Sequence, residues 1–135
     1  MLVIPSIVTQ IQGGTFDSLK VDTLDVSHFD TSRVTDMYRM FEGCKAKELD
    51  ISHFDTHKVT NMSCMFSSCQ VKELDVSHFD TSQVTNMSYM FSFCNAKELD
   101  VSHFDLSNVK NFSHVFKAFK GIIIGKEHFP KEAFI

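Results

Sequence analysis

Histidine and aspartate recur at a fixed spacing along this chain, and they are the first residues that could carry out chemistry. Five histidines stand 25 residues apart, and the first four precede an aspartate by two positions: His28, His53, His78, His103 and His128. Imidazole binds transition metals, but a metal centre needs three or four ligands that converge on one point. Evenly spaced residues offer single ligands along a line. We therefore expect the histidines and aspartates to shape turns, and we predict no metal site.

No sequence motif supports a catalytic function. The sequence has no glycine-rich phosphate loop and no nucleophile elbow. Its cysteines and histidines recur with the repeat, whereas an active site is a single constellation of groups. We predict that the protein is not an enzyme and needs no cofactor.

The 25-residue spacing extends to most of the chain. Each copy of the unit opens with leucine, at Leu24, Leu49, Leu74 and Leu99, and continues Asp-Val/Ile-Ser-His-Phe-Asp. A fixed period of this size is typical of repeat architectures, in which each unit packs on its neighbours. The predicted organisation is an N-terminal cap with a decayed repeat (1–23), four repeats (24–48, 49–73, 74–98 and 99–123), and a partial fifth repeat with a C-terminal cap (124–135).

Two hydrophobic periods alternate within a copy. In the copy 74–98, Leu74 and Val76 follow a period of two, which predicts a strand. The later apolar residues are spaced as on one face of a short helix: Val84, Met87, Met90, Phe91 and Cys94. We expect equivalent residues of successive copies to stack in the core, above all the phenylalanines in two rows: Phe41, Phe66, Phe91 and Phe116, and Phe29, Phe54, Phe79 and Phe104.

The recurring pattern V-x-x-L-x-V-S-x-F-D-T-S-x-V-T-N-M-x-x-M-F-x-x-C resembles the BspA-like leucine-rich repeat over about residues 21–123. That family is associated with bacterial surface proteins and with a mycoplasma family of unknown function. The resemblance implies an α/β repeat solenoid, a leucine-rich-repeat-like right-handed stack of short parallel strands and short helices. It also implies a binding role at the cell surface or outside the cell, usually towards other proteins.

Exposed positions of the repeat are the candidates for binding. Alternation along the strands places aspartate and serine outside, and the turn positions vary between copies. The predicted partner-binding residues are Asp50, Ser52, Asp75, Ser77, Asp100, Lys58, Gln83 and Tyr89. We expect a non-catalytic protein-binding or adhesion module whose partner is an unidentified protein. The alternative is a structural or assembly component of a surface layer, filament or virion, which associates through the apolar C-terminal end.

Charge and hydropathy restrict the partners further. The net charge is −4 and no basic run occurs, which argues against nucleic acid. No apolar stretch is long enough to cross a membrane. The apolar start lacks a basic region and meets Pro5 at once, so we recognise no signal peptide.

Four cysteines and three Asn-x-Ser triplets are the remaining residues that could carry chemistry. Cys44, Cys69 and Cys94 share one repeat position, which fits buried thiols or a disulfide between neighbouring copies. We expect Cys64 to be exposed, and free thiols would suit a reducing compartment. The triplets match the glycosylation acceptor. They recur only because the repeat recurs, so we expect Asn61, Asn86 and Asn111 to serve the backbone.

Overall fold

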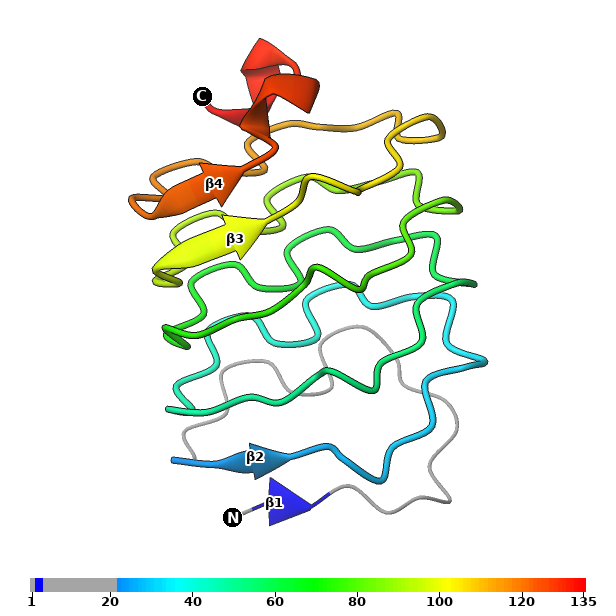
Figure 1. The fold of residues 1–135 in the computed structure, drawn as a ribbon, viewed down its shortest axis with the longest axis vertical. Coiled ribbons are helices and arrows are strands. Elements are labelled where there is room, and N and C mark those ends of the chain that lie inside the picture. Colours follow the sequence, from blue (N-terminus) through cyan, green and yellow to red (C-terminus); the bar gives the residue numbers. More distant parts are fainter. Residues whose placement is uncertain (1, 4–21) are drawn as a thin grey trace.

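The computed structural model describes residues 2–3 and 22–135. The predicted N-terminal cap (1–23) lies almost entirely outside these residues. The elements in chain order are β1 (Leu2–Val3), β2 (Leu24–Asp25), β3 (Glu98–Asp100), β4 (Ile122–Ile124) and the 3₁₀ turns η1 (Lys126–His128) and η2 (Lys131–Ala133). Strand β1 pairs with β2 and strand β3 with β4, both in parallel, as two separate two-stranded sheets (Figure 1).

The expected α/β solenoid of strands and helices is wrong. The described part of the chain contains no α-helix, and strands occupy only two or three residues each. Turns and irregular backbone make up most of residues 22–121 (Figure 1). No helix among the described residues is long and apolar enough to span a membrane.

The predicted helices are absent because each copy contains residues in the left-handed backbone conformation. In each copy two residues four positions apart have positive φ, with values from 57° to 67°: Arg39 and Gly43, Cys64 and Ser68, Tyr89 and Phe93, and His114 and Ala118. A right-handed helix cannot contain such residues. Overlapping turns replace it, for example with Met90 N–H donating to the Met87 carbonyl (3.1 Å) and Cys94 N–H donating to the Phe91 carbonyl (3.1 Å). A chain of three-residue turns repeats its buried positions at intervals of three and four, which is the spacing that suggested a helix.

Hydrogen bonds between copies take the place of the helical ones. Alternate amides of one copy donate to carbonyls 24 residues later, at 2.8–3.1 Å. In the first copy these donors are Met37, Arg39, Phe41 and Gly43, and the acceptors are Asn61, Ser63, Met65 and Ser67. The next two copies repeat the pattern. Each copy therefore satisfies alternate backbone amides on the neighbouring copy, and amides between them in its own turns.

The interior positions were predicted correctly. Phe41, Phe66 and Phe91 are fully buried, and both predicted phenylalanine rows lie in the core. Along the first row successive ring centroids are 5.6, 5.7 and 5.7 Å apart, with nearly parallel rings between Phe41 and Phe116. The methionines Met37, Met62 and Met87 are also fully buried, and Phe112 in the fourth copy is partly buried.

A buried threonine links each copy to the next. The Thr56 hydroxyl donates to the Asp80 carbonyl (2.9 Å) and accepts from the Asp80 amide (2.9 Å). Thr31 and Thr81 make the same pair of bonds to Asp55 and Asp105. In the fourth copy Leu106 replaces the threonine, and the residue 24 positions later is Pro130, which has no amide hydrogen to donate. The fourth copy therefore lacks both the threonine hydroxyl and the amide hydrogen that would bind it.

The C-terminal segment departs from the repeat by one residue. Ile123 pairs with Leu99 in register, so the prediction that Ile124 opens the next copy was wrong by one position. A one-residue shift turns every side chain of a strand to the other face. Consequently Ile122 and Ile124 point outward and are 63% and 41% exposed.

Residues after β4 lie at the C-terminal end of the molecule (Figure 1), and they pack against Phe116, the last phenylalanine of its row. The chain leaves β4 through Gly125, whose φ of 92° and close approach to Ser102 leave no room for a side chain. Phe129 packs edge-on against Phe116 at 5.0 Å, and the Phe116 amide donates to the Ala133 carbonyl (2.7 Å). Phe129 and Ala133 are buried, as a capping segment requires.

Removing the threonine hydroxyl tests the link between copies. Thr56→Val keeps the shape but leaves the Asp80 amide and carbonyl unpaired, so the free energy of unfolding should fall by about 2 kcal/mol in urea titrations. Thr56→Ser keeps the hydroxyl and loses one methyl group, with an expected loss of only about 1 kcal/mol. Equal stability of the two variants would show that the hydroxyl is not needed.

Candidate interaction site

Acidic side chains gather along one face of the described chain. Their carboxylates line two open hollows, and we call them the acidic face: Asp25, Glu48, Asp50, Glu73, Asp75, Glu98 and Asp100. They come from the segments that open successive copies, in the sequence Thr-Leu-Asp in the first copy and Glu-Leu-Asp in the next three. The leucine between them is buried at each position. Alternation about a buried leucine therefore turns both acidic neighbours outward.

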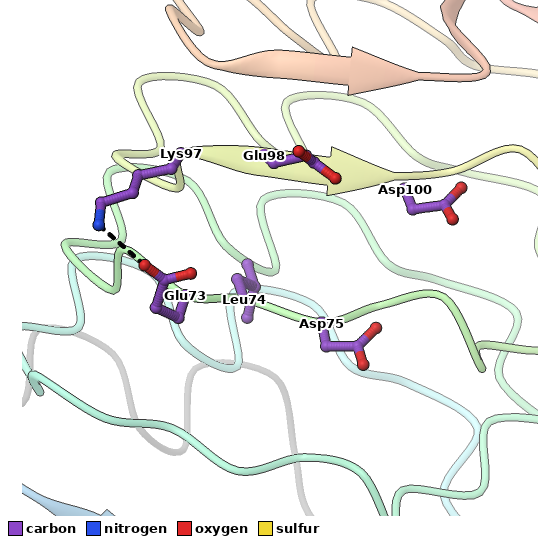
Figure 2. A pocket seen from close by; sticks show the side chains of 6 residues that line it. All are labelled: Glu73, Leu74, Asp75, Lys97, Glu98 and Asp100. Carbon is purple, nitrogen blue, oxygen red and sulfur yellow. Dashed lines mark ion pairs between the residues drawn. The ribbon is translucent and has the colours of Figure 1, made fainter.

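The larger hollow lies between the third and fourth copies. It has a volume of about 470 Å³ and is lined by Glu73, Leu74, Asp75, Lys97, Glu98 and Asp100. Figure 2 shows Asp75 and Asp100 on neighbouring copies with their carboxylates pointing the same way. The second hollow, of about 200 Å³, is lined by Thr23, Leu24, Asp25, Glu48 and Asp50. Both are open and shallow, which suits contact with another macromolecule better than enclosure of a small molecule.

The aspartates of the acidic face are held by their own backbone. Asp75 accepts hydrogen bonds from the Ser77 hydroxyl (2.6 Å) and the Ser77 amide (2.9 Å), and Asp100 accepts the same two bonds from Ser102. These bonds lower the pKa of both carboxyl groups below the ordinary value of 3.8, against the small opposing effect of burial. The aspartates are therefore charged and fixed in direction at neutral pH.

The glutamates are the freer members of the face. Among the described residues, Glu48 and Glu98 make no side-chain hydrogen bond or ion pair. Glu73 pairs with Lys97 at 2.9 Å (Figure 2), but both side chains are more than two-thirds exposed. Such a pair contributes little to stability. The nearby lysines Lys47 and Lys72 form no ion pair within the described residues.

The structure separates the predicted binding residues. It places Asp50, Asp75 and Asp100 in the hollows, with Ser52 and Ser77 as the donors that orient two of them. Lys58 and Gln83 are exposed but line neither hollow. Tyr89 lies elsewhere, with its ring 4.8 Å from that of His114. The eight residues therefore do not form one site.

Sequence reasoning missed Glu48, Glu73 and Glu98. The signal was present, because the alternation that places Asp50 outside also places Glu48 outside, two positions earlier. The glutamates are better candidates for contact than the aspartates, since their carboxylates are not committed to the backbone.

Two of the spaced histidines, His53 and His78, contribute to the packing between copies. The Nε2–H of His53 donates to the Val26 carbonyl (2.7 Å), and the Nε2–H of His78 donates to the Ile51 carbonyl (2.9 Å). Each ring also packs edge-on against the phenylalanine that follows it, at 5.3 and 5.2 Å. Within the described chain, no three histidine, cysteine or acidic side chains are grouped as metal ligands.

The cysteines and the triplet asparagines also have structural places. All four cysteines are free, and Cys44, Cys69 and Cys94 are buried, which favours the thiol interpretation over a disulfide. Cys64 is half-buried rather than exposed. Burial raises the pKa of Cys94 to about 11. Asn61 and Asn86 accept the amides of the serines two positions later, both at 2.9 Å, as the aspartates do.

Comparison with known proteins identifies a family but no activity. The family model described as "Mycoplasma protein of unknown function, DUF285" matches residues 11–123. Searches of curated proteins and of solved structures gave no significant match.

Acid should weaken the fold through its aspartates. Eight of them have a lowered pKa in the folded state: Asp25, Asp30, Asp50, Asp55, Asp75, Asp80, Asp100 and Asp105. Their contribution is fully present above the unfolded pKa near 3.8 and is lost as pH falls through the lower folded pKa. The urea midpoint should therefore decrease between about pH 5 and pH 2.

A matched variant separates charge from turn geometry in this experiment. In Asp75→Asn/Asp100→Asn the amide oxygens can still accept the serine amides, as those of Asn61 and Asn86 do. The variant should fold and should lose less stability in acid than the unaltered protein. An unchanged pH dependence would show that these carboxylates do not carry the effect.

Proposed function

Because the chain belongs to this Mycoplasma family of unknown function, we propose its activity from the structure: it is a non-catalytic module that binds a basic segment of a protein partner along the acidic face. The proposal rests on the row of carboxylates, which continues from copy to copy and lines two open hollows. Seven carboxylates face a single lysine among the residues that line them. A lysine- or arginine-rich segment is the complementary partner.

Two properties of the face support binding rather than solvation alone. The aspartates are already oriented by the serine hydrogen bonds, so little side-chain freedom is lost when a cation meets them. The glutamates stand beside them without a commitment to the backbone. The resemblance of the repeat pattern to BspA-like surface proteins agrees with a binding role, and we include location at the cell surface in this proposal.

Selection from a display library of random dodecapeptides tests the function on the full chain. We expect the enriched peptides to include a basic class. Its affinity should fall by about 3- to 30-fold in Glu73→Gln/Glu98→Gln, as the loss of two exposed charge contacts implies. The matched control is Glu127→Gln/Glu132→Gln, which removes two exposed carboxylates that line neither hollow. Equal weakening by both double variants, or the absence of basic peptides, would contradict the proposal.

Assembly is the second candidate function, and the exposed isoleucines of β4 favour it. Ile122 and Ile124 occupy the outward positions that Glu98 and Asp100 hold on the paired strand. Apolar side chains in place of acidic ones make this strand a suitable contact for a second copy of the chain. Such a contact would build a structural component of the surface-layer or filament type.

Sedimentation over a wide concentration range separates the two functions. The assembly candidate predicts growth in mass with concentration, which Ile122→Lys/Ile124→Lys should abolish without a change in the circular dichroism spectrum. The control Lys120→Gln/Lys126→Gln alters exposed residues beside β4 and should leave association unchanged. A constant monomer at all concentrations would exclude assembly through β4.

A further inference from the structure

Two aromatic residues of the third copy occupy places where neither the backbone nor the core needs them. Phe93 and Tyr89 have φ values of 58° and 59°, a left-handed conformation that bulky residues rarely adopt. Other copies hold smaller or polar residues at these positions: Gly43, Ser68 and Ala118 in place of Phe93, and Arg39, Cys64 and His114 in place of Tyr89. Phe93 is 52% exposed and Tyr89 39% exposed. The two exposed aromatic rings are therefore a feature of one copy that the repeat itself does not require.

Hydrogen bonds between copies bring these rings beside the fourth copy. The Phe93 amide donates to the Lys117 carbonyl (2.8 Å), and the Tyr89 amide donates to the Ser113 carbonyl (3.0 Å). The Tyr89 and His114 rings lie 4.8 Å apart with a tilt of 39°. A hollow of about 260 Å³ adjoins Phe93 and has Ala118 and Lys120 in its lining. We call these residues the aromatic–lysine patch: Tyr89, Phe93, His114, Lys117, Ala118 and Lys120.

The charge around the patch is opposite to that of the whole chain. The protein carries a net charge of −4, yet the segments 84–97 and 106–126 contain no aspartate or glutamate. Both lysines of the patch are exposed and make no ion pair within the described residues. Glu132, whose carbonyl accepts the His114 amide (2.9 Å), is the acidic residue tied to the patch by a backbone contact. The hollow is lined by the apolar residues Phe93, Ala96 and Ala118 together with Asn95 and Lys120. Such a lining fits an apolar side chain that has a carboxylate next to it.

We propose that the aromatic–lysine patch binds an acidic peptide segment of a protein partner, with an apolar side chain of that segment in the hollow beside Phe93. The acidic face and the patch share no residue, so this site is additional to the one proposed above. An anionic lipid bilayer would also meet aromatic and lysine side chains. The hollow favours a peptide, since it offers space for a side chain beside Phe93.

The same dodecapeptide selection contains the test, because the two sites predict opposite classes of peptide. We expect an acidic class with an apolar residue next to aspartate or glutamate. Phe93→Ser should weaken these peptides at least 10-fold, and serine is the residue that the second copy carries at this position. Lys117→Gln/Lys120→Gln should weaken them several-fold, whereas Lys58→Gln/Lys110→Gln, two exposed lysines outside the patch, should not.

The remaining outcomes decide against the proposal. Acidic peptides that bind Phe93→Ser as well as the unaltered protein would overturn it, as would a selection that returns no acidic class. Binding to phosphatidylserine vesicles that depends on Phe93, without peptide binding, would assign the patch to a membrane surface instead. Glu73→Gln/Glu98→Gln should leave the acidic class unchanged, so failure at either site is distinguishable from failure at the other.

Discussion

The structure depends on hydrogen bonds between residues 24 or 25 positions apart. In the described chain the strands have only two or three residues and α-helices are absent. Backbone amides of one copy therefore donate to carbonyls of the next. The threonine hydroxyls extend the same principle into the core, since each satisfies both a carbonyl and an amide of the following copy. Cooperativity along such a chain is between nearest neighbours. The threonine contact ends at Leu106, which lies opposite Pro130, while backbone bonds such as that from the Phe116 amide to the Ala133 carbonyl continue to the C-terminal segment.

The interior was predictable from the sequence, and the local conformation was not. Hydrophobic spacing reports which residues face inward, and the stacked rows from Phe41 to Phe116 and from Phe29 to Phe104 were correctly assigned. The same spacing does not distinguish a helix from overlapping turns, because both return to one face after three or four residues. The deciding feature is the positive φ at Tyr89, Phe93 and their equivalents. Only Gly43 among these residues signals it in the sequence, and one glycine in one copy is a weak signal.

The candidate sites could also be predicted only in part from the sequence. Alternation placed Asp75 and Asp100 outside correctly, but residue type drew attention to aspartate and serine rather than to the glutamates next to the same leucines. The serine hydrogen bonds that occupy the aspartates appear only in the structure. The one-residue shift at β4, which exposes Ile122 and Ile124, was also hidden, because Ile122, Ile123 and Ile124 are identical residues and do not reveal a register.

Some positions of the repeat stabilise the fold and others are available for recognition. Hydrogen bonds from side chains to the backbone distinguish the two groups. Aspartate, asparagine and threonine positions that recur in the copies are occupied by backbone partners, so their recurrence reflects packing. The copies differ most at one left-handed position, which holds arginine, cysteine, tyrosine and histidine in successive copies. The third and fourth copies depart furthest from the repeat, with the exposed rings of Phe93 and Tyr89 and with Lys117 and Lys120, which form no ion pair within the described residues. The aromatic–lysine patch therefore lies where the repeat is broken, whereas the acidic face is built from residues that recur in successive copies.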